Sequence, residues 1–172
     1  MIIIRQETPA DIAAIHAVNK QAFDGRKAEA CLVDAIRKTE NFIPKLSLVA
    51  EDNGQILGHI LFSRIYIETV SGTVPAIALA PMAVLPKYQK RGIGSALVKC
   101  GLDECRNLGH ATVIVLGHPT YYPRFGFSAV LAKSLECPFG NCGDAWMALE
   151  LLPNALQDVH GKVVYPPAFH GV

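Results

Sequence analysis

The sequence is short of charge. Of its 172 residues, 18% are Asp, Glu, Lys or Arg, below the ~25% that is usual for globular proteins, and the formal net charge is +1. So small a net charge argues against a nucleic-acid-binding module that relies on phosphate contacts. Hydrophobic residues make up 51% of the chain, which excludes intrinsic disorder. The shortage of charge is compatible with a cleft or with a homodimer.

Long unbroken hydrophobic runs are also missing. The longest uncharged stretch, residues 69–86, contains Gly72 and three prolines, so we expect extended chain and no membrane-spanning helix. The opening residues MIIIRQET lack the basic segment and long apolar run of a signal peptide. We therefore expect a cytoplasmic protein without a membrane partner.

Five cysteines are present, at positions 31, 100, 105, 137 and 142. An odd number without a secretion signal predicts reduced thiols. Cys137 and Cys142 could form half of a metal site, but no second pair stands at zinc spacing, so we expect no metal. Cys100 and Cys105 fall on a predicted helix, where packing in the core is the default expectation.

Residues 1–172 read as a single domain, without repeats, linkers or low-complexity tracts. Hydrophobic patterning predicts two helices after Thr8 and a third after Gly92. It also predicts strands at 2–7, 46–51, 56–67, 74–85, 111–116 and 146–152, and an extended tail at 162–169. The strand–helix–strand order after residue 74 indicates a right-handed parallel unit. We therefore predict an α+β fold whose mixed sheet has antiparallel N-terminal strands and one parallel pair, flanked by helices.

Turn and cap residues mark the ends of these elements. Thr8 followed by Pro9 is typical of a helix start, and Asp24-Gly25 of a break. Asn53-Gly54 is the strongest hairpin signal in the chain. Gly109 stands where a helix C-terminal glycine is expected.

The most informative segment runs from residue 81 to residue 97, PMAVLPKYQKRGIGSAL. Gly92 and Gly94 allow close approach to a ligand at a helix N-terminus, whose free N–H groups suit a pyrophosphate. Positive charge is supplied nearby by Lys87, Lys90 and Arg91. Two glycines at this spacing occur about once by chance in such a chain, so the loop alone also fits an ordinary helix start. The segment is neither a Walker loop nor a complete dinucleotide fingerprint.

Pro81 interrupts the apolar strand that precedes this loop. Because proline cannot donate to a ladder, it predicts either a bulge or an edge strand, and the apolar run argues against an exposed edge. A bulge would free backbone groups near residues 82–84, and bulges often lie beside active sites.

Two motifs together resemble a known family. Residues 89–94, QKRGIG, resemble the Gln/Arg-x-x-Gly-x-Gly/Ala acyl-CoA loop of GNAT-type N-acetyltransferases. Residues 122–127, YPRFGF, resemble the family's Tyr-x-x-hydrophobic-Gly-Phe signature, with one helix and one strand between the motifs. The similarity extends over most of the chain and is strongest to a bacterial subgroup of N-acetyltransferases with undefined acceptors.

The resemblance implies acetyl-CoA as co-substrate, without a metal. Its pantetheine arm would lie along Met82, Ala83 and Val84, and a backbone N–H of Ala83 or Val84 would polarise the thioester. Tyr122 would protonate the departing thiolate. The implied loop contacts are Gln89, Lys90, Arg91, Gly92, Ile93, Gly94 and Ser95.

The sequence departs from the family pattern before the tyrosine motif. The asparagine of many members is missing, and only residues 117–120 connect strand and tyrosine. Tyr121 and Tyr122 are adjacent, so either could face the sulfur, and the spacing to Phe127 favours Tyr122. The sequence does not decide which group is the general base. Residues 76–85 contain no carboxylate, and either His118 or water could accept the proton. His59 and Glu68 are more readily structural or solvated.

The function implied is transfer of the acetyl group of acetyl-CoA directly to a primary amine, of a small molecule, in a ternary complex. A non-catalytic CoA-binding sensor or interaction protein and a protein or peptide N-acetylase are the alternatives. The acceptor pocket is expected between the first two helices, the loop at 137–144 and the tail at 165–169. The charges of the first two helices are of mixed sign and do not indicate the acceptor: Arg26, Lys27, Glu29 and Asp34.

Overall fold

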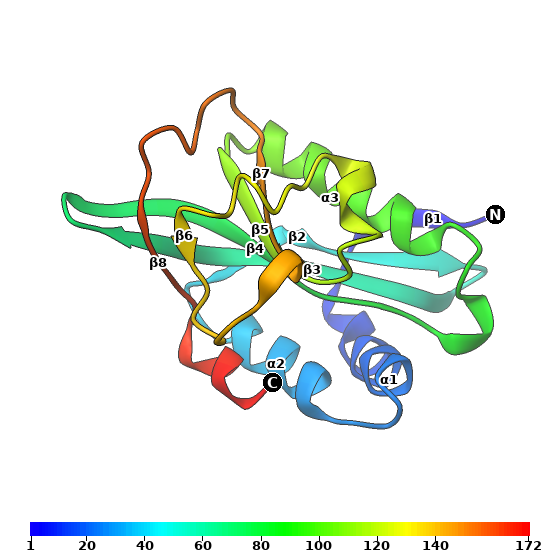
Figure 1. Cartoon of the computed structure of the whole chain (residues 1–172). Helices are drawn as coiled ribbons and strands as arrows, with labels where there is room; N and C mark the ends of the chain where they lie inside the picture. Colours follow the sequence, from blue (N-terminus) through cyan, green and yellow to red (C-terminus); the bar gives the residue numbers. More distant parts are fainter.

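A computed structural model of the whole chain, residues 1–172, has one mixed sheet of eight strands (Figure 1). The central strands lie in the order β1-β2-β3-β4-β5-β7. Neighbours are antiparallel except β4 and β5, and the short β6 and β8, which are parallel. The predicted fold class is therefore confirmed. The elements in chain order are β1 (Ile3–Gln6), α1 (Ile12–Ala22), α2 (Ala28–Arg37), β2 (Phe42–Asp52), β3 (Gln55–Thr69), β4 (Gly72–Val84), α3 (Ile93–Asn107), β5 (Thr112–Leu116), β6 (Leu135–Glu136), β7 (Trp146–Glu150) and β8 (Gly161–Val164).

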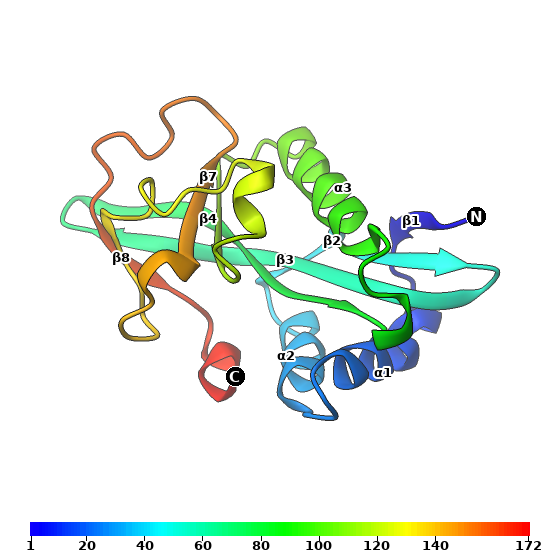
Figure 2. The ribbon, with the colours of Figure 1, turned by 45° about the vertical axis from the view of Figure 1, so that its right-hand side comes forward.

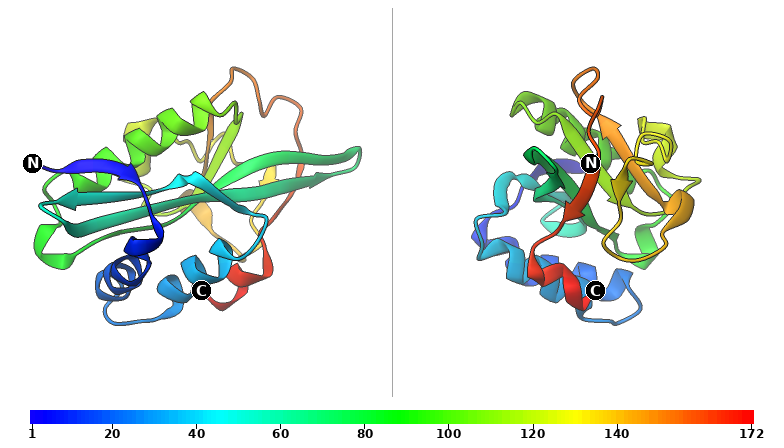
Figure 3. Two further views of the ribbon diagram at one scale, coloured as in Figure 1. Left: turned by 180° about the vertical axis from the view of Figure 1, so that it is seen from behind. Right: turned by 60° about the vertical axis from the view of Figure 1, so that its left-hand side comes forward.

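The helices lie on opposite faces of this sheet. Figure 3 shows α3 on one face and α1 with α2 on the other. Each face has its own hydrophobic core, and β3 contributes to both: Leu61 and Ile65 pack on the α1 and α2 side, Leu57 and Phe62 on the α3 side. Burying each such side chain stabilises the fold by about 1.5–3 kcal/mol. No helix is both long enough and apolar enough to cross a membrane.

The turn predictions are confirmed by backbone geometry. Asn53 and Gly54 have φ of 50° and 82°, as the two central residues of a tight hairpin require. Gly109 has φ of 83° after α3, the conformation expected of a glycine that ends a helix. The first helix begins later than predicted, because residues 9–11 form a 3₁₀ turn before α1. Asp11 ends this turn by accepting hydrogen bonds from the Thr8 backbone N–H, at 2.7 Å, and from Arg5.

Two regions of extended chain differ from the sequence prediction. Strand β2 starts at Phe42, four residues before the predicted start, because pairing with β3 carries the chain through Pro44. The extended tail predicted after residue 161 is strand β8 only as far as Val164. A 3₁₀ turn, Pro167–Gly171, follows and packs beside α2, as Figure 1 shows near the C-terminus.

The prediction of uniformly reduced thiols is wrong in this structure. Cys137 and Cys142 form a disulfide, which closes a loop between β6 and β7. An odd count requires only that one thiol stays unpaired, and the chain folds back over five residues to bring this pair together. Cys105 is buried, and burial raises the pKa of its thiol to about 12. Cys100 is exposed, so the packing prediction holds for Cys105 alone.

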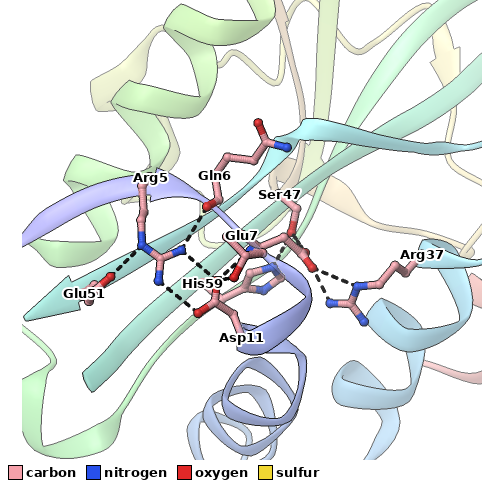
Figure 4. A network of polar contacts seen from close by, with 9 residues as sticks. Arg5, Gln6, Glu7, Asp11, Arg37, Ser47, Glu51 and His59 are labelled. Atoms are coloured by element: carbon pink, nitrogen blue, oxygen red, sulfur yellow. Dashed lines mark hydrogen bonds and ion pairs between the residues drawn. The ribbon is translucent and has the colours of Figure 1, made fainter. Parts of the chain in front are cut away.

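A buried polar network joins the sheet to the first two helices (Figure 4). The His59 ring is fully enclosed, with Nε2 2.9 Å from Ser47 Oγ and Nδ1 3.2 Å from Asn19 Nδ2. Ser47 also bonds Glu7, and Arg37 of α2 donates to the same carboxylate at 3.0 Å. Serine, histidine and glutamate in contact suggest a nucleophilic site, but Ser47 and His59 have no exposed surface. The group is structural, as expected for His59 from the sequence.

We expect this network to make the protein sensitive to acid. Burial, reinforced by nearby Arg37, lowers the pKa of His59 to about 3. An unfolded chain takes up this proton below pH ~6.5 whereas the folded chain does not, so stability is present above that pH and is lost as pH falls toward 3. Urea unfolding between pH 6.5 and 4.5 should show a decline of about 1 kcal/mol per pH unit from this residue. In His59→Gln, which cannot titrate at this position, the free energy of unfolding should decline with pH less steeply by that amount. Equal slopes for the variant and the wild type would contradict the lowered pKa of His59.

Helix α3 packs on the sheet through a glycine. A Cβ added to Gly101 would overlap the buried ring of Phe62. We expect Gly101→Ala to lower the free energy of unfolding by about 1–3 kcal/mol, because overpacking outweighs the better helix propensity of alanine. Chemical denaturation measures this. Lys99→Ala, at an exposed position of the same helix, is the control and should change stability little.

Candidate active site

Strands β4 and β5 separate and leave an open edge. They pair only at Ile77–Val113 and Ala78–Ile114, after which β4 continues beside β3 (Figure 2). From Leu79 to Met82, β4 advances by three residues, whereas the paired stretch of β3, residues 60–62, advances by two. This register shift is the bulge that Pro81 predicted. The β4 edge that faces β5 therefore has no strand partner from residue 79 to residue 84.

The register decides which backbone groups reach this edge. Leu85 N–H donates to the Leu57 carbonyl at 2.8 Å, so it points toward β3. Because donors alternate along an antiparallel strand, Ala83 N–H also faces β3, whereas those of Met82 and Val84 face the open edge. The Val84 carbonyl accepts a hydrogen bond from Gln89 Nε2 at 3.0 Å, which ties the following loop to the strand.

The turn into α3 presents a row of free donors. None of the backbone N–H groups from Lys90 to Ser95 donates a hydrogen bond within the protein. Lys90 and Gly92 have φ of 63° and 86°, a conformation that turns the chain sharply into the helix. These N–H groups lie at the positive end of the α3 dipole, where an anion is stabilised.

The open edge and this turn line one cavity of about 680 Å³. Of the ten residues predicted to bind the co-substrate, nine line it; the exception is Arg91, whose guanidinium lies 5.5 Å from the Tyr88 ring centre. Arg124 lines the same cavity and adds positive charge that the sequence reasoning did not include. The cavity thus combines an anion-binding end with a strand edge that can pair with an amide-bearing chain. These features fit the pyrophosphate and pantetheine of CoA.

A second cavity of about 480 Å³ adjoins the first. Both are lined by Phe23, Met82, His118 and Tyr121, so they meet at these residues. The remaining walls are largely apolar. They include residues from the three regions predicted to shape an acceptor pocket: Glu29 and Leu32 of α2, Phe139 of the disulfide loop, and Tyr165 and Phe169 of the tail.

The two adjacent tyrosines have different surroundings. The Tyr122 ring is buried against Phe127, with centroids 5.7 Å apart, and Gly117 leaves it room because a Cβ there would overlap the ring. Burial raises the pKa of Tyr122 to about 12, with a smaller contribution from Tyr121. Its hydroxyl makes no hydrogen bond within the protein, whereas the Tyr121 hydroxyl lies 3.0 Å from Ser95 Oγ. Tyr122 therefore has the hydroxyl without a partner in the protein, and it lines the second cavity, whereas Tyr121 lines both cavities.

Candidate bases are few. His118 is exposed where the two cavities meet, and its carbonyl accepts from the N–H groups of Tyr121 and Tyr122. Glu68 is exposed on β3 and lines neither cavity. Glu29, which sequence reasoning passed over, lines the second cavity and is buried. No group of three or more His, Cys, Asp or Glu side chains is arranged to hold a metal ion.

The fold and these motifs define an acyl-CoA-dependent acetyltransferase, and comparison with known families agrees. Residues 12–127 match the model of the acetyltransferase (GNAT) family. The chain belongs to this family, which confirms the resemblance found in the sequence.

Similar proteins span the whole chain. The uncharacterized N-acetyltransferase YhbS of Escherichia coli K12 is 32% identical over 98% of this chain and 99% of its own. The crystal structure of E. coli YhbS in complex with CoA has a TM-score of 0.90 at 34% identity, covering 98% of this chain and 92% of that one. A GNAT family acetyltransferase from Brucella melitensis, in complex with acetyl-CoA, has a TM-score of 0.81 at 34% identity, covering 98% of each chain.

Proposed function

We propose that this protein transfers the acetyl group of acetyl-CoA directly to a primary amine of a small molecule, with both substrates bound together. The observation that carries the proposal is the pair of cavities that meet at Met82, His118 and Tyr121. One has the anion-binding turn and open strand edge that suit CoA, and the other is a separate, largely apolar chamber. Two substrates held in adjoining chambers react without the entropy cost of a chance encounter.

The chain's own groups supply what the reaction needs. Acetyl-CoA brings a thioester, whose acetyl carbon is open to attack by an uncharged amine and whose thiolate departs. The N–H groups of Met82 and Val84 are the donors at the strand edge that can stabilise the oxyanion, an interaction worth about 3 kcal/mol. Tyr122 gives its hydroxyl proton to the departing sulfur. His118 accepts the amine proton, directly or through water.

The aromatic lining of the second cavity supports a small acceptor with an apolar body. The disulfide loop contributes Phe139, and the tail contributes Tyr165 and Phe169. The ring centroid of Tyr165 lies 4.9 Å from that of Phe139 and 4.9 Å from that of Phe169. These rings meet edge to face and line one part of the cavity. A peptide would need an open groove along that part.

Thiol release from acetyl-CoA, measured with a panel of amines, amino acids, polyamines and lysine peptides, tests the proposal. We expect release that depends on a small amine, together with calorimetric binding of CoA. Binding of CoA without release on any acceptor would instead identify a CoA-binding sensor. Release with peptides alone would identify a protein acetylase, and no binding of CoA would overturn the assignment of the turn at residues 90–95.

A further inference from the structure

The second cavity has one acidic side chain in its lining. Glu29, in the first turn of α2, is the single acidic side chain among the residues that line it, and no lysine or arginine lines it. Its side chain is 8% exposed. The cavity therefore has one acidic side chain, and most of the other side chains that line it are aliphatic or aromatic.

One of the two Glu29 carboxylate oxygens has no hydrogen-bond partner. Oε1 accepts a hydrogen bond from Arg26 Nη2 at 2.8 Å, whereas Oε2 is buried and makes no hydrogen bond. A buried carboxylate oxygen without a donor is costly. Because Oε2 has almost no exposed surface, a ligand can supply that donor once the Glu29 side chain rotates toward the cavity. Arg26 compensates weakly, because its own side chain is 65% exposed and its charge is screened by water.

Glu29 lines the second cavity and not the cavity that suits CoA. The residues shared with the CoA cavity are Phe23, Met82, His118 and Tyr121, and Glu29 is not among them. Attack on the thioester requires an uncharged amine. A cationic group held by Glu29 is therefore a second group of the acceptor and not the amine that reacts.

We propose that Glu29 binds a cationic group of the acceptor, and that the acceptor is a diamine, or a similar amine with a second positive charge, whose two ends are joined by an apolar body. This rests on the proposed acetyltransferase function. The cation donates to the Glu29 carboxylate, and the aromatic rings of Phe139, Tyr165 and Phe169 pack on the apolar body. An acceptor of this class satisfies both the charge and the apolar walls of the chamber.

The test compares three probes of equal length: 1,5-diaminopentane, 5-amino-1-pentanol and n-pentylamine. We expect the wild type to have the highest kcat/KM with the diamine. Glu29→Gln should raise the KM for the diamine about 10- to 100-fold, as loss of a charge-assisted hydrogen bond does, and leave the monoamines and the KM for acetyl-CoA unchanged. Equal losses on all three probes, or no preference for the diamine in the wild type, would overturn the proposal.

Two further variants separate charge recognition from general effects. Arg26→Gln removes the competing cation, so we expect the KM for the diamine to fall or stay level. Glu68→Gln removes an exposed carboxylate from β3 and should change nothing. If no amine is acetylated, calorimetry of 1,5-diaminopentane with the CoA-loaded protein still decides the matter: binding that Glu29→Gln weakens supports the cation site although the acetyltransferase function fails, and absence of binding refutes the site.

Discussion

Replacing Tyr122 with phenylalanine should lower kcat about 100-fold, while the affinity for CoA and the KM for the amine stay nearly the same. The change removes one hydroxyl that makes no hydrogen bond within the protein, and the ring keeps its packing against Phe127 and Gly117. Stability should therefore be preserved. Because burial raises the pKa of Tyr122 to about 12, this hydroxyl keeps its proton throughout the neutral range.

Tyr121→Phe is the matched control. The Tyr121 hydroxyl already lies within hydrogen-bonding distance of Ser95, at the start of α3, so its loss should affect CoA binding more than the chemical step. Steady-state kinetics with a saturating amine, and calorimetry with CoA, measure both variants. A large fall in kcat for Tyr121→Phe, with Tyr122→Phe near wild type, would exchange the roles of the two tyrosines.

The CoA side of the site could be predicted from the sequence because it is local. The positive φ of Gly92, the free donors at the start of α3 and the bulge at Pro81 each depend on a few consecutive residues. The choice between the N–H groups of Met82, Ala83 and Val84 could not be made in this way. It depends on the register between β3 and β4, which the bulge shifts by one residue and which long-range pairing determines.

The acceptor side was only partly predictable because it is assembled from distant segments. The sequence indicated the three regions that line it, but the mixed signs of charge in the first two helices hid the importance of Glu29. That importance comes from burial: Arg26 is largely exposed, and Glu29 faces an apolar chamber that exists only after α2, the disulfide loop and the tail have packed together. The pairing of Cys137 with Cys142 is local, but it was missed because the odd number of cysteines was interpreted as a sign of reduced thiols.

Gly94→Leu should weaken CoA binding at least 100-fold. Gly94 lies in the first turn of α3, where a Cβ would come within 3.2 Å of the Met82 side chain and 3.4 Å of the Tyr121 hydroxyl. A full leucine side chain would fill the space between the helix N-terminus and the strand edge, so the phosphate oxygens could not approach the backbone donors. Leucine is a good helix former, so the fold should survive.

Ser95→Ala is the control for Gly94→Leu, because it changes the neighbouring side chain and keeps every backbone donor. We expect its affinity for CoA to stay within a few-fold of the wild type. Calorimetry with CoA, with thermal unfolding as a check of the fold, distinguishes the two variants. If Gly94→Leu binds CoA as tightly as the wild type, the diphosphate does not lie on this turn. The strand edge at Met82 and Val84 would then lose its proposed ligand as well, because one cavity joins it to the turn.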